Sequence, residues 1–510
     1  MTLLSTCTLL TACGGGPSVV ADPTQVEGGP ANTQNPLVAK YTIASACQGQ
    51  GMVEFGPDTS YGRGTPWYPV PGHYQPITIL VAGMRASTTY HMRSQVQCLG
   101  NTLTNSDSTF TTGSLPPIAF PTLTVTRPNP SLSSIENPGI EMITIPSAGT
   151  PALFTDRDGN PIWYYDVGQA NYPFTIKSLL NSDIILSIVR PSDSVLQEVD
   201  LAGTTIHEMT IEALDQKMQA AGFDFFPGGF HHDVLPLDNG HLIVLTNFVK
   251  EFTNLPGYPG TTEVLGDGLI DLDQRWNPVW AWNSFDYLDV NRHLNGLPDW
   301  THANALVYSP GDGNVLLSMR HQSWVLKIDY SNGVGSGKVL WRLGYQGDFA
   351  LTQNGVPTDD PSLWFSFQHF PSLVSQSGPQ TVLGIWDNGD YRVLDASGAT
   401  CTIPGPPFCY SRATIFQIDE SAMVANLFWD DAPGYFSEWG GNINQLANGN
   451  VEFDVNDPQI LPAPNVASEV QEVTQTSNPE VVWKMDFFEP YSTYRAYRVP
   501  SLYTGVTWQF

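Results

Sequence analysis

Asp312-Gly313-Asn314, followed by Val339-Leu340-Trp341, is one copy of a unit that recurs from about Pro121 to the C-terminus. In each copy an Asn-Gly or Asp-Gly turn joins two apolar strands, and a later strand ends in Trp. Such turns need positive φ, which Gly and Asn adopt most readily, so they predict β-hairpins. The other turns are Asp158-Gly159-Asn160, Asp238-Asn239-Gly240, Asp387-Asn388-Gly389 and Asn448-Gly449-Asn450, and the other Trp strands end at Trp163, Trp280 and Trp483.

This repeat predicts an all-β fold with a six-bladed β-propeller over residues 120–510. The 46 Gly, 41 Pro and 11% aromatic residues, together with short apolar runs, favour many short strands over helices. The units recur roughly every 60–80 residues, and about 390 residues at that period make six blades. In a propeller the innermost strands surround one central channel. A β-sandwich or a two-sheet array is the alternative.

Residues 38–115 are predicted to form a separate, small β-sandwich. Alternating strands end with Ser87–Arg93 and Ser108–Thr112, which resembles the close of a fibronectin-III-like domain. Pro116-Pro117 then marks a linker. We expect this domain to act as a spacer or lid.

Residues 1–13 resemble a bacterial lipoprotein signal. The apolar stretch is too short to span a bilayer and ends in Leu10–Gly14, which predicts lipidation of Cys13. The Gly/Pro-rich residues 14–37 are predicted to be a flexible tether. No Lys or Arg precedes the apolar stretch, so a plain secretory peptide is the alternative. The prediction is an exported, periplasmic or cell-surface lipoprotein that contacts the membrane only through its lipid anchor.

Export also predicts disulfides, because oxidised cysteines persist outside the cytosol. Once Cys7 leaves with the signal and Cys13 carries lipid, four cysteines remain. Cys47 and Cys98 share one N-terminal segment, and Cys401 and Cys409 bracket a short loop, so we predict two disulfides. These remaining cysteines lack the close CxxC spacing of a zinc site, so we expect no structural metal.

The charge of the chain limits its partners. With 21 Lys and Arg against 49 Asp and Glu, the net charge is −28, which repels nucleic-acid backbones. We therefore expect no nucleic-acid partner. The partners that this charge still allows are small neutral molecules, or anions that reach a locally basic pocket.

Histidines recur at equivalent positions of the strand pattern. Only 10 of 510 residues are His, yet Phe230-His231-His232-Asp233, Thr301-His302-Ala303-Asn304, Arg320-His321 and Gln368-His369 repeat one setting. In a propeller these side chains would converge at the mouth of the channel. Such a cluster suits a nucleophile, an acid/base set, a metal or an anion. We expect no metal, because the motifs place no carboxylate beside these histidines at ligand spacing.

Arg342 interrupts the apolar strand Leu340–Gly344. A buried guanidinium is costly unless it is paired. It therefore either forms a salt bridge with a carboxylate, or joins the histidines in binding a tetrahedral oxyanion, which suits its planar fork.

These motifs, taken in order, resemble the bacterial aryl sulfate sulfotransferases. The resemblance is strong over about 200–420 and architectural over roughly 40–510. It is carried by Phe230–Asp233, Asp299–Asn304, Arg320–Ser323, Gln368-His369, Trp386–Arg392 and Tyr410–Arg412. It implies a propeller behind an N-terminal β-sandwich, and sulfuryl transfer from a phenolic sulfate donor to a phenol acceptor through a covalent sulfohistidine. No cofactor is implied, and the oligomeric state stays open, a homodimer included.

The resemblance also assigns roles. His369 matches the nucleophile, and His321, His231 and Arg342 match groups that bind the transferred sulfuryl group. His232 is the alternative to His231. We expect His302, Arg320 and Asn304 to bind substrate.

One departure from the family pattern is Phe370-Pro371, where Thr commonly follows Gln-His, so acceptor fit is open. Two other functions compete. A quinone-dependent dehydrogenase would need calcium-binding carboxylates at the channel, which the motifs do not supply. A surface-tethered propeller that binds ligands without catalysis would make the recurrence of His incidental.

Overall fold

We describe residues 25–403, 406–458 and 465–509 of a computed structural model of the chain. The expected signal 1–13, with Cys13, lies outside these residues. Strands dominate, and the described part contains one α-helix, α1 (Ile211–Ala221), and short 3-10 helices. The all-β prediction is therefore confirmed. The 3-10 helices are η1 (Pro130–Ile135), η2 (Ser284–Asp286), η3 (Arg320–Gln322), η4 (Ser331–Gly333) and η5 (Pro361–Leu363).

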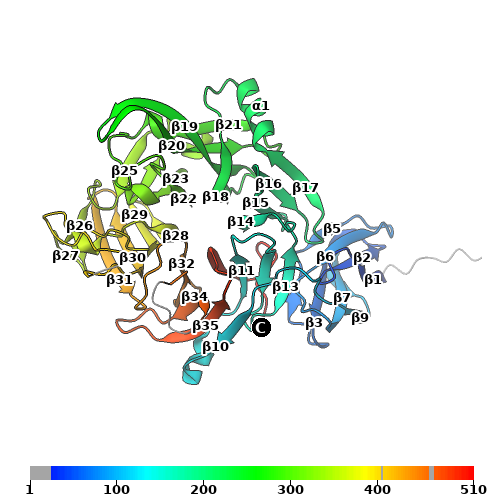
Figure 1. The fold of residues 1–510 in the computed structure, drawn as a ribbon. Coiled ribbons are helices and arrows are strands. Elements are labelled where there is room, and N and C mark those ends of the chain that lie inside the picture. The colour runs from blue at the N-terminus through cyan, green and yellow to red at the C-terminus, as the bar shows by residue number, and fades with distance from the viewer. Residues whose placement is uncertain (1–24, 404–405, 459–464, 510) are drawn as a thin grey trace, which may run out of the picture.

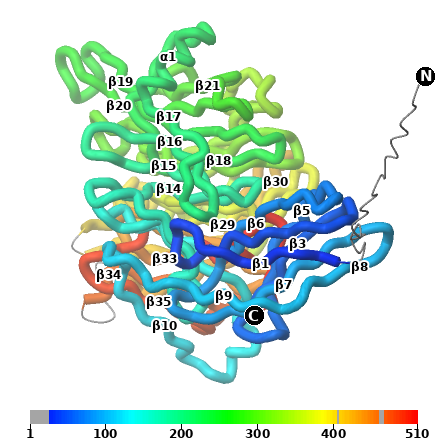
Figure 2. The backbone as a smooth tube through the Cα atoms, turned by 90° about the vertical axis from the view of Figure 1, so that its right-hand side faces the viewer, coloured from blue at the N-terminus to red at the C-terminus, as the bar shows by residue number. Residues whose placement is uncertain are grey.

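The N-terminal part folds as two small sheets on one side of the molecule (Figure 2). The first contains β1 (Val26–Asn32), β2 (Ala39–Ser45) and β6 (Ile77–Val81). The second contains β3 (Gly49–Gly56), β4 (Arg63–Gly64), β5 (Tyr68–Val70), β7 (Thr89–Cys98), β8 (Asn101–Thr104) and β9 (Ser108–Thr111). Strand β1 lies inside the range expected to be a tether, so this part of the tether prediction is wrong: β1 pairs with β2 along its whole length.

Six further sheets follow one another around a common axis (Figure 1), and we call these six sheets the ring. In chain order they are β11 (Ile140–Thr144), β12 (Ala152–Thr155) and β13 (Pro161–Tyr165) with β36 (Arg495–Val499); β14 (Tyr172–Ser178), β15 (Ile184–Val189), β16 (Ser194–Val199) and β17 (Thr205–Thr210); β18 (Gly229–Pro236), β19 (Leu242–Leu255), β20 (Tyr258–Leu272) and β21 (Pro278–Asn283); β22 (Ala303–Ser309), β23 (Asn314–Met319), β24 (Trp324–Ile328) and β25 (Val339–Leu343); β26 (Ala350–Gln353), β27 (Val356–Pro357), β28 (His369–Ser377), β29 (Gln380–Asp387), β30 (Arg412–Asp419) and β31 (Val424–Asp431); and β10 (Leu123–Thr126), β32 (Ile443–Gln445), β33 (Val451–Asn456), β34 (Val466–Val473) and β35 (Val481–Phe488).

The inner strands of neighbouring sheets contact one another around the axis. Strand β18 contacts β14 and β22, and β28 contacts β22 and β32. Four of the predicted turns form hairpins, at Gly159, Gly240, Gly313 and Gly449, each with positive φ. The fifth, Asp387-Asn388-Gly389, is not a hairpin, because β29 ends at Asp387 and β30 begins only at Arg412.

Both predicted disulfides are present. Cys47–Cys98 joins the N-terminal sheets with a Cα–Cα distance of 6.1 Å, and Cys401–Cys409 closes the loop between β29 and β30 at 5.0 Å. Within the described residues, no helix is long and apolar enough to cross a membrane.

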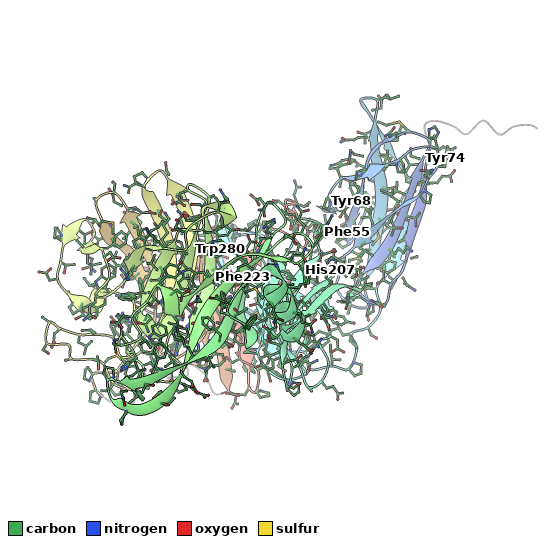
Figure 3. All side chains as sticks on the ribbon, turned by 90° about the horizontal axis from the view of Figure 1, so that it is seen from above. Phe55, Tyr68, Tyr74, His207, Phe223 and Trp280 are labelled. Atoms are coloured by element: carbon green, nitrogen blue, oxygen red, sulfur yellow. A yellow bond between two sulfur atoms is a disulfide. The ribbon has the colours of Figure 1, made fainter. Side chains whose placement is uncertain are left out.

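The C-terminal segment ties the ring to the N-terminal sheets. The hydroxyl of Tyr503 donates to the carbonyl of Leu80 at 2.8 Å, and Nε1 of Trp508 donates to the carbonyl of Gly64 at 2.9 Å. Figure 3 shows the two parts side by side, with Phe55, Tyr68 and Tyr74 on the N-terminal sheets and His207, Phe223 and Trp280 on the ring. The N-terminal unit is thus packed against the ring.

The last strand closes the ring. Strand β36 pairs antiparallel with β11, so the C-terminus completes the sheet that the N-terminal part of the ring began. Arg498 of β36 is almost completely buried and binds Glu141 of β11, Glu472 of β34 at 2.8 Å and Glu452 of β33 at 3.3 Å. One guanidinium therefore joins three strands from two neighbouring sheets at the junction.

Replacing Arg498 tests this closure. We expect Arg498→Met to lower the free energy of unfolding by about 3–5 kcal/mol, because three buried carboxyl groups lose their cation. Urea unfolding followed by tryptophan fluorescence measures the change. The control is Arg190→Met, which removes a more exposed pair with Glu208 and should cost at most about 1 kcal/mol. Equal effects of the two variants would contradict a special role for Arg498.

Candidate functional site

The predicted histidines meet where the inner strands begin. The imidazole rings of His232 and His302 have centroids 4.9 Å apart, and those of His302 and His321 are 4.5 Å apart. Tyr494, just before β36, joins them, with its ring 5.9 Å from His232 and 6.0 Å from His369. We call His231, His232, His302, His321 and His369 the histidine cluster. Residues from four sheets thus surround one place.

Local irregularities in the strands aim these side chains at the axis. The register of β18 against β19 shifts between Phe230 and Val234, and that of β28 against β29 shifts between His369 and Ser372. β-bulges of this kind redirect side chains next to functional sites. His232 and His302 also have φ of 51° and 47°, a left-handed conformation that costs non-glycine residues roughly 1–2 kcal/mol. Strain held at one place by surrounding structure is typical of functional sites.

His369 is held in one tautomer. Its Nδ1 lies 2.7 Å from Oδ1 of Asn388, while Nδ2 of Asn388 donates to the carbonyls of Ser437 and Gly440 at 2.8 and 3.1 Å. The amide is thereby fixed as an acceptor, so Nδ1 must carry the proton and Nε2 keeps its lone pair. Burial, followed by the charge of Arg320, lowers the pKa of His369 well below its usual value. The result is a neutral imidazole whose Nε2 is unprotonated and accepts a hydrogen bond from the N–H of Gly440 at 3.3 Å.

His321 is linked to Arg320. Its Nδ1 lies 2.7 Å from the carbonyl of Asp299, so Nδ1 donates and Nε2 accepts, from Nη1 of Arg320 at 2.7 Å. Burial and the proximity of His302 lower the pKa of His321 to about 4. Nε of Arg320 is buried and has no hydrogen-bond partner among the described residues. Arg320 therefore supplies an unused N–H donor beside the cluster.

A carboxylate does join the histidines, contrary to the expectation from the motifs. Oδ2 of Asp299 lies 2.6 Å from Nδ1 of His302. Asp299, His302 and His321 present ligand atoms within 4.8 Å of one another, a grouping that could hold a metal ion. However, Nε2 of His321 already accepts from Arg320, and a cation beside this guanidinium would be repelled. The charge at this place suits an anion better.

His232, rather than His231, faces the cluster. The ring of His232 contacts His302 and Tyr494, whereas Nε2 of His231 lies 3.2 Å from Oδ1 of Asp267. The two are joined by their Nδ1 atoms, 2.8 Å apart. The structure therefore favours the alternative, His232, at this position.

Arg342 is not part of this arrangement. Its guanidinium is about one-third exposed, pairs with Asp348 at 3.3 Å and lies over the ring of Trp324. The salt-bridge alternative describes it, and no contact among the described residues joins it to the histidines. Its expected place is taken by Arg320 and by Arg495, which is buried, binds the carbonyl of Asn304 and lies 3.3 Å from Oδ1 of Asp233.

Asn304 and Asp387 have structural contacts at the site. Nδ2 of Asn304 donates to the carbonyl of Gln368 at 2.8 Å and so braces the strand that carries His369. Asp387 binds Arg392 at 2.5 Å and Arg412 at 2.8 Å, all three nearly completely buried. Both arginines are therefore buried and not paired at the surface. Their buried cluster holds Asn388 in place.

Comparison with known proteins agrees with the geometry. The family model described as Arylsulfotransferase (ASST) matches residues 140–498, well over half of the chain. This chain belongs to the arylsulfotransferase family. The matched range includes the whole histidine cluster, Asn388 and Arg495.

Individual relatives are distant. Arylsulfate sulfotransferase AssT of Escherichia coli O6:H1 (strain CFT073) is 27% identical over 150 residues, which is 26% of this chain and 23% of that protein. The aligned part is thus about a quarter of the length of either protein. Among solved structures, a protein of unknown function from Bacteroides caccae gives a TM-score of 0.42 at 9% identity, covering 70% of this chain and 98% of its own. A mutant Synechocystis apocarotenoid oxygenase gives 0.31 at 9% identity, covering 90% and 81%.

The tautomer of His369 in this family member can be tested directly. From about pH 8 down to about pH 5.5 we expect Nδ1 of His369 to stay protonated and Nε2 to stay unprotonated, because the pKa of the ring is depressed well below 6.5. Nitrogen NMR of His-labelled protein, assigned with His369→Gln, measures this. The same residue in urea should protonate near pH 6.5. Protonation of the folded protein near that value would contradict the assignment.

Proposed function

We propose that this chain is a sulfotransferase that moves a sulfuryl group from a phenolic sulfate ester to an acceptor phenol through a sulfohistidine at His369. The observation that carries the proposal is the imidazole of His369, kept neutral by burial and presented through Nε2 by Asn388. Membership of the arylsulfotransferase family supports the substrate class. The description of AssT as an arylsulfate sulfotransferase supports it further.

The first step forms a bond from Nε2 of His369 to sulfur. The bond between sulfur and the phenolic oxygen breaks, and its electron pair leaves with the phenolate. Because the pKa of a phenol is about 10, phenolate is a fair leaving group that takes a proton afterwards. Nδ1–H of His369 stays bonded to Asn388, which stabilises the positive ring of the sulfohistidine.

In the second step the oxygen of an acceptor phenol bonds to sulfur while the bond from sulfur to Nε2 breaks. The electron pair returns to Nε2 of His369, and the acceptor loses its proton to solvent. The enzyme is restored, so donor and acceptor react in turn in a ping-pong mechanism.

Donors around His369 would stabilise the charge on the equatorial oxygens of the sulfuryl group. By analogy with phosphoryl transfer, this charge spreads over three oxygens in the transition state. Two donors could serve here: the Nε–H of Arg320, which has no partner among the described residues, and the N–H of Gly440, which Nε2 of His369 releases when it bonds to sulfur. One such donor contributes about 2.7–4 kcal/mol in comparable sites. His302 and His321 would complete the anion pocket.

The larger setting of this activity is also a proposal. We infer that the six sheets are the blades of one propeller, that Cys13 carries lipid, and that the enzyme is exported to the periplasm or cell surface. The substrates are then small phenols and their sulfate esters. No cofactor takes part.

The decisive assay is release of 4-nitrophenol from 4-nitrophenyl sulfate, with and without added phenol. We expect phenol to accelerate release, and His369→Ala to lower the rate by at least about 10³-fold, because the covalent path is lost. The control is His207→Ala, a half-exposed histidine bound to Glu198, which should leave the rate unchanged. No release by folded wild type with several donors would instead favour a ligand-binding propeller without catalysis.

Metal removal separates the anion-binding interpretation from a metal site at Asp299, His302 and His321. We expect incubation with EDTA followed by desalting to leave the rate unchanged, because Arg320 occupies Nε2 of His321 and repels a cation. Metal analysis by mass spectrometry accompanies the assay. Loss of activity that one added divalent metal restores would overturn the proposed charge pattern.

A further inference from the structure

A cavity distinct from the histidine cluster, which we call the lower cavity, lies on the ring axis, on the far side of Phe370 from His369. Its volume is about 560 Å³, within the range of small-molecule sites. Part of its lining comes from strands that also reach the histidine cluster, a few residues further along each. Leu235 follows His232 on β18, Leu306 of β22 follows His302, and Lys177 of β14 follows Phe174, whose ring contacts His232.

The offset along the strands sets the depth of this cavity. Three to four residues of a β-strand span roughly 10–13 Å. Phe370, directly after His369, lines the cavity, and the guanidinium of Arg495 lies 4.6 Å from its ring. Phe370 and Arg495 thus stand between the cavity and the cluster. The cavity is a separate compartment of the same axis.

Lys177 gives this compartment a positive charge. Its Nζ lies 4.7 Å from the ring of Phe370 and 5.0 Å from that of Tyr497, and it is mostly buried. Its one carboxylate partner among the described residues, Asp233, is 3.4 Å away and is shared with Arg495 at 3.3 Å. Two cations therefore share one anion. Burial lowers the pKa of Lys177, as expected for an ammonium group that is incompletely compensated.

The other buried acids near the cavity do not cancel the excess positive charge at Lys177. Asp454 is fully buried and accepts from the hydroxyl of Thr493 at 2.7 Å. Burial raises its pKa to about 7, so a large share of this carboxyl group is neutral near pH 7. The carboxyl groups of Glu141, Glu452 and Glu472 share Arg498, and burial raises the pKa of Glu141 and Glu452, which favours their neutral forms. The excess positive charge at Lys177 remains.

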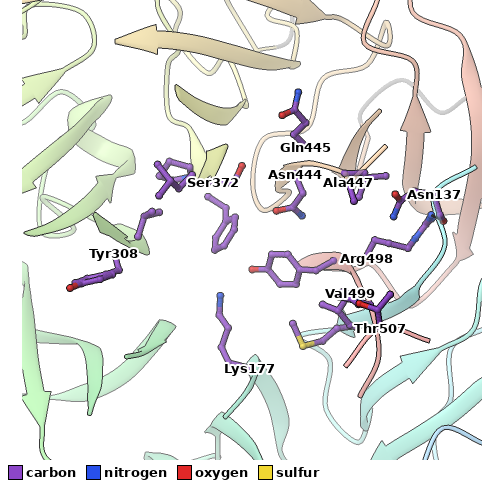
Figure 4. A pocket seen from close by; sticks show the side chains of 18 of the residues that line it. Asn137, Lys177, Tyr308, Ser372, Asn444, Gln445, Ala447, Arg498, Val499 and Thr507 are labelled. Atoms are coloured by element: carbon purple, nitrogen blue, oxygen red, sulfur yellow. Dashed lines mark hydrogen bonds between the residues drawn. The ribbon is translucent and has the colours of Figure 1, made fainter. Parts of the chain in front are cut away.

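Polar groups without acceptors also line the cavity. Nδ2 of Asn444 is buried and donates to none of the described residues, and the hydroxyl of Tyr497, a residue 9% exposed, interacts with Arg495 but has no acceptor among them. Buried polar groups normally find partners, so such donors point to a missing acceptor. In Figure 4 the ammonium group of Lys177 points into the middle of the pocket, and Asn444 lies on the opposite wall. Much of the remaining lining is apolar, including Met142, Leu306 and Leu373.

We propose that this lower cavity binds a small aromatic monoanion, with its anionic group between Lys177 and Asn444 and its ring against Phe370. The apolar wall suits a flat ring, and the single excess positive charge suits one negative charge. The donors of Asn444 and Tyr497 would bond the anionic oxygens. This site is distinct from the proposed nucleophile and does not depend on sulfuryl transfer.

Calorimetric titration with 4-nitrobenzoate tests the proposal without any turnover. We expect saturable binding to wild type, and at least about tenfold weaker binding to Lys177→Met, which removes the cation but keeps most of the apolar stem. The neutral probe 4-nitrobenzamide should bind at least about tenfold more weakly than the anion to wild type, and equally to both proteins. Asn444→Ala should weaken binding of the anion about threefold.

Two controls locate the binding. Lys250→Met removes an exposed lysine that also lies over aromatic rings, those of Phe252 and Phe285, and should leave the affinity unchanged. Arg320→Met removes the cation beside the histidine cluster and should also leave it unchanged. Loss of binding in Arg320→Met but not in Lys177→Met would place the anion at the cluster and overturn the proposal. Absence of saturable binding to wild type would do the same, whatever the outcome of the sulfotransferase assay.

Discussion

The pairing of β36 with β11 is the constraint on which the rest of the structure depends. It returns the C-terminal strand to the first sheet of the ring, where Arg498 binds carboxylates from β11, β33 and β34. The same strand begins at Arg495, so closure also carries Tyr494 and Arg495 to the ring axis. Without it, neither the aromatic contact to His369 nor the shared pairing of Asp233 would form.

Burial along the axis has opposite uses at its two ends. At the histidine cluster it keeps His369 and His321 neutral, so that Nε2 of each ring is unprotonated, with the tautomer of His369 set by Asn388 and Nε2 of His321 bound by Arg320. At the lower cavity it leaves Lys177 short of negative charge. Phe370 and Arg495 stand between the two ends. A nucleophile and an anion-binding compartment can therefore share one set of strands without sharing their chemistry.

Local signals predicted the hairpins and the histidines, whereas long-range contacts decided the rest. Asn-Gly and Asp-Gly turns depend on the φ of one or two residues, and four of the five form as expected. The exception, Asp387-Asn388-Gly389, is held by buried Arg392 and Arg412, which turn chemistry alone does not reveal. Asn388 lies in the motif Trp386–Arg392, which carries part of the family resemblance, so a role for it at the site could have been predicted from the sequence.

Arg495 and Arg342 show where sequence reasoning stops. Arg342 lies within β25 and Arg495 begins β36, and only tertiary contacts distinguish the arginine paired with Asp348 from the one on the axis. Likewise, His231 and His232 both lie in the irregular stretch between Phe230 and Val234, and only their contacts distinguish them. The early start of the N-terminal sheets at Val26 depends on pairing with β2, which composition does not encode.

The central claim is a covalent intermediate on His369, and mass analysis tests it most directly. Leaderless protein would be incubated with 4-nitrophenyl sulfate in the absence of acceptor, digested and mapped by tandem mass spectrometry. The account predicts one added sulfuryl group on the peptide containing His369, removed by a later addition of phenol. A sulfuryl group found stably on another residue, or acceptor-dependent turnover without any adduct, would contradict it.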